Sequence, residues 1–194
     1  MSPTPLPLRT FKRQQMLPKG SYWHIREGLI RSITWDEEGN IIALGLWGPG
    51  DIVSSQLSSL DLFELECQTR VVVEALETET VDRNALMTQH FRCTEQLLSI
   101  SRTRRAEIRL ARLLEWLARR FGLPEMEGYT IHLDRIYLTH GSLGDLNCST
   151  RVTITRLLNS FEVQGAIAYH SRRTMWINPG KLPHRAPGGW LRAA

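Results

Sequence analysis

The stretch that decides the fold reads Leu138-Thr-His-Gly-Ser-Leu-Gly-Asp-Leu-Asn-Cys-Ser-Thr-Arg-Val-Thr-Ile-Thr-Arg-Leu-Leu158. Thr139 can cap a first helix through its hydroxyl, and the Asn-Cys pair that follows this helix suits a tight turn. Ser149 or Thr150 can cap a second helix, which we expect to continue to about Gln164. The stretch therefore predicts two short helices joined by a tight turn.

The second helix has one apolar face. Its apolar residues recur at the spacing i, i+3, i+4, i+7, which places them on one side of a helix: Ile154, Leu157, Leu158 and Phe161. Downstream, Ala166–Tyr169 and Thr174–Ile177 are predicted to form a hairpin around His170-Ser-Arg-Arg173. Two helices followed by a hairpin make a winged helix-turn-helix.

A winged helix-turn-helix can read DNA, because arginine at a helix N-terminus can donate two hydrogen bonds to guanine in the major groove. Wing side chains would contact phosphates, which set register without reading sequence. The alternative is a helical hairpin with a solvated basic face. The predicted DNA-binding residues are Thr139, Ser149, Thr150, Arg151, Val152, Thr153, Arg156, Arg172 and Arg173.

Upstream, residues 82–121 contain no proline or glycine and are predicted to be helical. Four leucines, at positions 110, 113, 114 and 117, form an apolar stripe. Packing into the core is one interpretation of this stripe. The other is dimerisation through Glu95–Phe121, and we therefore expect 82–121 to be a dimerisation and linker region.

The N-terminal part, residues 1–81, has the pattern of a small antiparallel β-barrel or jelly roll. Short apolar runs at Ile25–Trp35, Ile41–Trp47 and Arg70–Leu76 are separated by turn residues. Three prolines in Met1–Arg9 favour a loose arm before this barrel. With residues 122–194 as the winged helix-turn-helix domain, the predicted fold class is α+β.

Composition limits the function. The net charge is +4, which favours a polyanionic partner without requiring one. Cys67, Cys93 and Cys148 are too far apart for a zinc site, an iron–sulfur cluster or a disulfide framework, and reduced thiols are expected of a cytoplasmic protein. No apolar run approaches the roughly 18 residues of a membrane span, and no signal peptide is expected.

The Leu138–Leu158 stretch resembles the helix-turn-helix of the CRP/FNR superfamily, and Ser149–Leu158 is most similar to its nitrogen-control, NtcA-like branch. Gly28, Asp36–Gly39 and Gly48-Pro-Gly-Asp51 resemble the sensor barrel of that superfamily. The resemblance implies a homodimer that binds a palindromic promoter site on double-stranded DNA, with RNA polymerase as a candidate partner. It also matches Arg151 and Arg156 to DNA-contacting arginines, and places Val152 where CRP carries glutamate.

The sequence departs from that family in its barrel, which looks contracted before Tyr22. The family's cyclic-AMP cassette needs a Gly-Glu pair after the Pro-Gly-Asp turn, and Ile52-Val-Ser-Ser-Gln-Leu57 does not supply it. No cyclic-AMP binding is therefore expected. An iron–sulfur cluster and a haem are not expected either, because neither ligand pattern is present.

Arginines concentrate at Arg102-Thr-Arg-Arg105, and either an interdomain face or an anion site explains them. The candidate effector residues are Arg9, Lys12, Arg13, Arg102, Arg104 and Arg105. Cyclic di-GMP and 2-oxoglutarate are candidate ligands, the second through the branch resemblance alone. A second-messenger receptor acting mainly through a protein partner is the alternative function. A metal enzyme on a cupin-like barrel is not expected, since only His24 lies in the barrel region.

Overall fold

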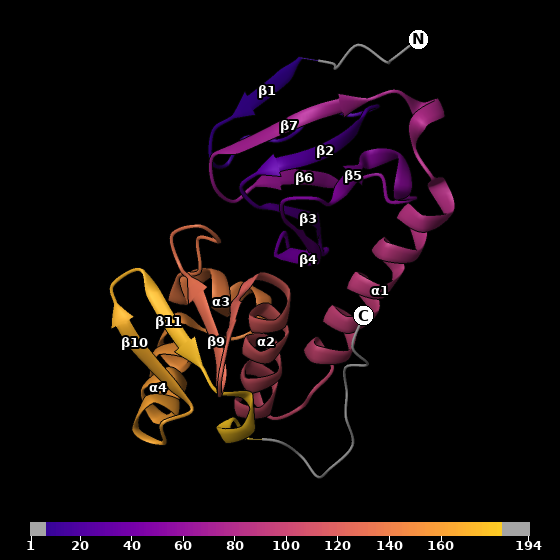
Figure 1. The fold of residues 1–194 in the computed structure, drawn as a ribbon. Coiled ribbons are helices and arrows are strands. Elements are labelled where there is room, and N and C mark those ends of the chain that lie inside the picture. Colours follow the sequence, from indigo (N-terminus) through magenta and orange to yellow (C-terminus); the bar gives the residue numbers. More distant parts are fainter. Residues whose placement is uncertain (1–6, 184–194) are drawn as a thin grey trace.

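The computed structural model describes residues 7–183 and shows a β-barrel joined by two successive helices to a C-terminal module of helices and a small sheet (Figure 1). Every paired strand is antiparallel. The α+β fold class is therefore confirmed, with a barrel at the N-terminus and a winged helix-turn-helix at the C-terminus.

The barrel consists of two sheets with the strand orders β1-β7-β2-β5 and β4-β3-β6. Large apolar side chains, among them Trp23, Ile30, Leu65 and Val73, form its core. Its strands are β1 (Leu8–Phe11), β2 (Tyr22–Glu27), β3 (Ile30–Trp35), β4 (Ile41–Trp47), β5 (Ile52–Ser54), β6 (Glu64–Cys67) and β7 (Val71–Leu76), with short 3-10 turns at Ser55–Leu57 and Thr78–Thr80.

The single strand predicted over Ile25–Trp35 is wrong, because two strands divide this segment at Gly28. Gly28 has a φ of +87°, which glycine adopts readily, and a Cβ at this position would lie 2.2 Å from the carbonyl oxygen of Arg70. The sharp turn sends β2 into one sheet and β3 into the other. Glycine at this position therefore lets the chain cross between the two sheets.

The predicted N-terminal arm also needs correction within the described residues. Leu8–Phe11 forms strand β1, which pairs with β7 in the register Leu8 to Glu74. Figure 1 shows β1 at the outer edge of the barrel. An edge strand pairs on one side only, so Pro7 is tolerated next to it, and the rest of the predicted arm, residues 1–6, lies outside the described residues.

The long helix predicted for residues 82–121 is in fact two helices, α1 (Arg83–Ser101) and α2 (Ala106–Phe121). All four leucines of the predicted dimer stripe lie on α2 and are fully buried within this chain. The core-packing interpretation is therefore correct for these leucines. A dimer interface would have to use a different face.

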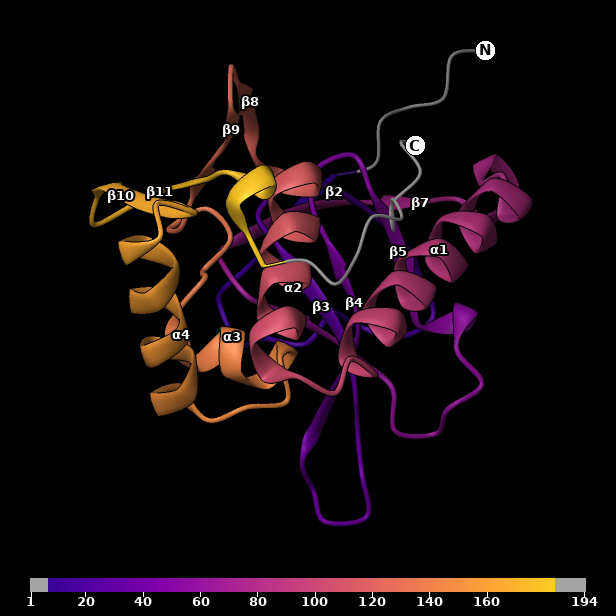
Figure 2. The same ribbon diagram turned by 90° about the horizontal axis from the view of Figure 1, so that it is seen from below.

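The C-terminal module consists of a helix pair and a four-stranded sheet with the order β10-β11-β9-β8. Figure 2 shows α2 beside α3 and α4, and their buried residues belong to one apolar core. The elements are β8 (Leu123–Glu125), β9 (Gly128–His132), α3 (His140–Leu146), α4 (Arg151–Val163), β10 (Ile167–Ser171) and β11 (Thr174–Ile177), with a 3-10 turn at Pro179–Lys181.

Candidate DNA interface

The two helices of the helix-turn-helix begin where their capping residues predict. The hydroxyl of Thr139 accepts a hydrogen bond from the backbone N–H of Ser142, 3.1 Å away, at the start of α3. At the start of α4, the hydroxyl of Thr150 accepts one from the N–H of Thr153, at 3.2 Å. Each hydroxyl satisfies a backbone donor that the first turn of a helix leaves without a partner.

The turn between α3 and α4 is tight. Cys148 adopts a φ of +45°, which is uncommon for a residue with a side chain. A Cβ on Gly144 would lie 2.7 Å from the carbonyl oxygen of Ser149, so glycine is required where α3 and the entry to α4 meet. This close approach fixes the position at which α4 starts.

The side chain of Arg109 on α2 donates hydrogen bonds to the turn between α3 and α4. Its Nε donates to the carbonyl oxygen of Asn147 at 2.6 Å, and its Nη1 donates to the carbonyl oxygen of Thr103 at the same distance. Its Nη2 lies 3.3 Å from the Ser149 hydroxyl, which is half-buried. Ser149, predicted as a DNA contact and as one of two candidate caps, thus belongs to the hydrogen-bond network of the turn, and Thr150 is the cap.

The face of α4 opposite the core is open to solvent. Ile154, Leu158 and Phe161 are buried, while Val152 exposes 78% of its surface. The predicted contact residues of the first two turns follow the same division: Thr150, Arg151 and Arg156 are exposed, and Thr153 is half-buried beside its cap. The first turn therefore presents an arginine, a threonine and a valine to any ligand that approaches it.

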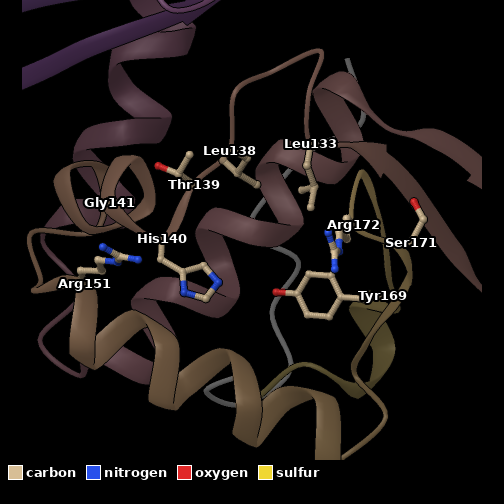
Figure 3. Close-up of a pocket in the computed structure, with 9 residues that line it drawn as sticks. All are labelled: Leu133, Leu138, Thr139, His140, Gly141, Arg151, Tyr169, Ser171 and Arg172. Atoms are coloured by element: carbon tan, nitrogen blue, oxygen red, sulfur yellow. The ribbon is translucent and has the colours of Figure 1, made fainter.

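A groove of about 790 Å³ runs from the start of α4 to the wing hairpin of β10 and β11 (Figure 3). Arg151, His140 and Thr139 lie on one side of it, and Tyr169 and Arg172 lie on the other. Three of the predicted DNA-contact residues, Thr139, Arg151 and Arg172, thus line one groove. Arg173 is exposed at the tip of the wing and does not line the groove.

Two groove residues were missed by sequence reasoning. The Nδ1 atom of His140 lies 2.8 Å from the hydroxyl of Thr155 on α4, which orients the ring across the helix pair. Tyr169 of β10 lines the groove and is 38% exposed, and burial raises the pKa of its hydroxyl above the ordinary value. The sequence did indicate where both residues lie, because His140 follows the predicted cap Thr139 and Tyr169 belongs to the predicted hairpin.

The predicted effector residues separate into two groups. At the barrel edge, Arg9 lies 5.5 Å from the ring centroid of Trp23 and Arg13 lies 3.6 Å from that of Tyr137. Lys12 belongs to the same segment, where its backbone N–H donates to Gln15. Arg102, Arg104 and Arg105 instead lie between α1 and α2, at the opposite end of the molecule (Figure 1). One small ligand cannot contact both groups.

Within residues 7–183, no cluster of three His, Cys, Asp or Glu side chains could hold a metal ion. In the same part of the chain, no helix has both the length and the apolar character needed to cross a bilayer. Cys67 and Cys93 are buried thiols, and burial raises the pKa of Cys67 to about 12. A thiol with so high a pKa is a poor nucleophile.

A barrel, a connecting helix and a winged helix-turn-helix with an exposed basic first turn define a class of DNA-binding regulators. The family model of the Crp-like helix-turn-helix domain matches residues 108–184. The regulatory protein CysR of Synechococcus elongatus is 48% identical over 182 residues, which is 92% of this chain and 88% of that protein. The chain belongs to the CRP/FNR superfamily of transcription regulators and is related to its NtcA branch.

Other comparisons agree on the family and on the fold. The global nitrogen regulator of Synechococcus elongatus is 32% identical over 118 residues, covering 61% of this chain and 51% of that protein. The solved structure of FixK2 from Bradyrhizobium japonicum superposes with a TM-score of 0.74 at 16% identity, covering 93% of this chain and 98% of that one. A receptor that acts mainly through a protein partner is not favoured by these relatives.

Proposed function

We propose that this regulator acts in the cytoplasm as a homodimer on a pseudo-palindromic promoter site, with α4 of each protomer in the major groove. The observation that carries the proposal is the groove in which Arg151 of α4 faces Arg172 of the wing. A duplex seated there would meet a base-reading arginine and a phosphate-binding arginine together. RNA polymerase bound at the same promoter is the partner through which such a regulator would act.

The individual roles follow from position. Arg151 is the first residue of α4, where a side chain reaches base edges, and a guanidinium there can pair with guanine O6 and N7. Val152 offers methyl groups that can contact a thymine methyl. Thr150, Thr153 and Arg156 border this contact, whereas Thr139, Arg172 and Arg173 would contact phosphates.

Dimerisation is assigned to α1, since the leucine stripe of α2 is buried within the chain. Leu86, Cys93 and Leu97 of α1 are buried. A second apolar stripe faces solvent through Met87, Phe91 and Leu98, which are 59%, 70% and 59% exposed. Met87, Phe91 and Leu98 are spaced four and seven residues apart, so they lie on one side of the helix. Thr94, at the intervening position, donates its hydroxyl to the carbonyl oxygen of Leu44 at 3.1 Å. The same helix of a second protomer would cover this stripe, which accounts for two apolar faces on one helix.

Sedimentation tests the dimer. Phe91→Arg with Leu98→Arg should yield a monomer whose circular dichroism matches that of the wild type, because both side chains are exposed. Arg92→Glu, an exposed change on α1 outside the stripe, should remain dimeric. A wild-type chain that sediments as a monomer at micromolar concentration would contradict this assignment.

DNA binding tests the rest of the proposal. Anisotropy titration of a selected palindrome should show tight binding by the wild type and weak binding by the monomeric double variant, since each protomer then holds only one half-site. Arg172→Ala should lower the slope of log affinity against log salt by about one unit for each contact removed, with sequence preference unchanged. Equal affinity of the wild type for a palindrome and for a half-site would contradict the dimeric mode.

A further inference from the structure

The turn between α1 and α2 encloses a cavity of about 530 Å³ with an unusual lining. Of the seven described residues that line it, four are arginines and none is an aspartate or a glutamate: Ser99, Arg102, Thr103, Arg104, Arg105, Ile108 and Arg112. A larger cavity beside the barrel also has four arginines, yet Glu27, Asp51 and Asp134 share its wall. The hinge cavity therefore differs in having no carboxylate in its lining.

The local fold brings these arginines together. Helix α1 ends with Arg102 as its C-cap, and α2 begins after Arg105 as its N-cap, so the arginines between the helices line one short bend. No side chain caps the N-terminus of α2, and its partial positive charge is offset by the partial negative charge at the C-terminus of α1 in the same bend, so the arginines supply the positive charge of the cavity. Arg105 pairs with Glu107 at 3.2 Å, and solvent screens the pair because the side chain of Arg105 is 73% exposed and that of Glu107 is 33% exposed.

We propose that this cavity, defined here as the hinge site, binds a small anion that carries two or more phosphate groups. Arginine pairs with phosphate through two parallel hydrogen bonds, and four guanidinium groups match more than one phosphate. Among the described residues that line the cavity none is aromatic, so within residues 7–183 the phosphates rather than a base would be recognised. The cavity volume lies within the range of about 300–1,000 Å³ that small-molecule sites occupy.

Thr103 links the hinge site to the DNA interface. Its hydroxyl accepts a hydrogen bond from Arg112 Nη1 at 2.6 Å, on the cavity side. Its carbonyl oxygen accepts one from Arg109, which also holds Asn147 in the turn before α4. Figure 2 shows the α1–α2 turn beside the helix pair. An anion that draws Arg112 away from Thr103 would shift this chain of contacts and change the position of α4.

This inference rests on the proposed function, because it makes the hinge site the effector site of a DNA-binding regulator. Inorganic pyrophosphate is the probe, titrated calorimetrically into the full chain at constant ionic strength. The wild type should bind it, and Arg104→Ala with Arg105→Ala should weaken binding by about tenfold or more. Arg83→Ala, an exposed arginine at the far end of α1, should bind as the wild type does. No binding by the wild type at millimolar pyrophosphate, or equal binding by the double variant, overturns the proposal.

Anisotropy with labelled duplexes separates a small-anion site from a contact to flanking DNA. Saturating pyrophosphate should change the affinity of the wild type for its duplex by about fivefold or more and leave that of the double variant unchanged. If the double variant instead has a lower salt slope on a duplex with long flanks only, the arginines contact DNA and the small-anion proposal is wrong. A wild type that binds pyrophosphate but no duplex would refute the proposed function and leave the hinge site standing.

Discussion

Replacing Arg109 by methionine tests whether this one side chain fixes the turn before α4. Methionine keeps much of the length and apolar contact of the side chain and removes all its donors. The two shortest hydrogen bonds of the Arg109 side chain, each 2.6 Å long, are donated to the carbonyl oxygens of Asn147 and Thr103. A hydrogen bond to a charged group contributes about 1.5–3 kcal/mol, and two that share one guanidinium are not additive. We expect Arg109→Met to lower the free energy of unfolding by about 2–4 kcal/mol.

Urea unfolding followed by far-ultraviolet circular dichroism measures this change. Arg119→Met is the matched control, because Arg119 lies on the same helix, is 45% exposed, and forms an ion pair with Glu115. Loss of this ion pair should lower the free energy of unfolding by less than about 0.5 kcal/mol. The free energy of unfolding of Arg109→Lys should lie between those of Arg109→Met and Arg119→Met, since an ammonium group keeps the charge but cannot span both carbonyl oxygens. Equal unfolding midpoints for Arg109→Met and Arg119→Met would refute the reasoning.

Two further changes test other parts of the structure. Gly144→Ala should destabilise the chain by about 1–3 kcal/mol and weaken DNA binding, because its Cβ would lie 2.7 Å from the Ser149 carbonyl oxygen. Gly141→Ala on the same helix meets nothing closer than 3.6 Å and should be neutral or stabilising in the same melts. Burial against Trp47 lowers the pKa of His90 below the unfolded value of 6.5. As the pH falls, the unfolded state therefore binds the proton before the folded state does. The free energy of unfolding should decrease as the pH drops below about 6.5. His90→Phe should flatten that slope in melts between pH 7 and pH 5, and an unchanged slope would show that His90 does not cause it.

The helix-turn-helix could be predicted from the sequence because its determinants are local. Thr139 and Thr150 cap their helices with hydroxyls that belong to the same turn. The inward face of α4 repeats at helical spacing, and Ile154, Leu158 and Phe161 are buried as that spacing requires. Caps and periodicity act over a few residues, so no knowledge of the rest of the chain was needed.

The break between α1 and α2 could not be predicted, since no proline or glycine marks it. The bend is held by Thr103, whose carbonyl oxygen and hydroxyl accept hydrogen bonds from Arg109 and Arg112, six and nine residues along. Side chains of the following helix therefore define the end of the preceding one. Because of this break, the predicted effector residues Arg102, Arg104 and Arg105 line one cavity. The leucine stripe of α2 is buried in the core.

Strand β1 was missed for a related reason. Leu8–Phe11 is an edge strand whose partner, β7, lies more than sixty residues further along the chain. Its four residues are mostly exposed and carry no alternation between apolar and polar side chains. Pairing with β7 therefore makes it a strand, and its own sequence gives little indication of it.

Selection of binding sites from random duplexes, run with the wild type, Arg151→Ala and Arg172→Ala, tests the central claim most directly. The wild type should select a palindrome whose half-site has guanine followed closely by thymine, as expected for Arg151 followed by Val152 at the start of α4. Arg151→Ala should lose about 1–3 kcal/mol per half-site and relax preference at one symmetric base pair, while Arg172→Ala weakens all sequences alike. If Arg151→Ala keeps both the affinity and the sequence preference of the wild type, α4 is not the element that reads the DNA.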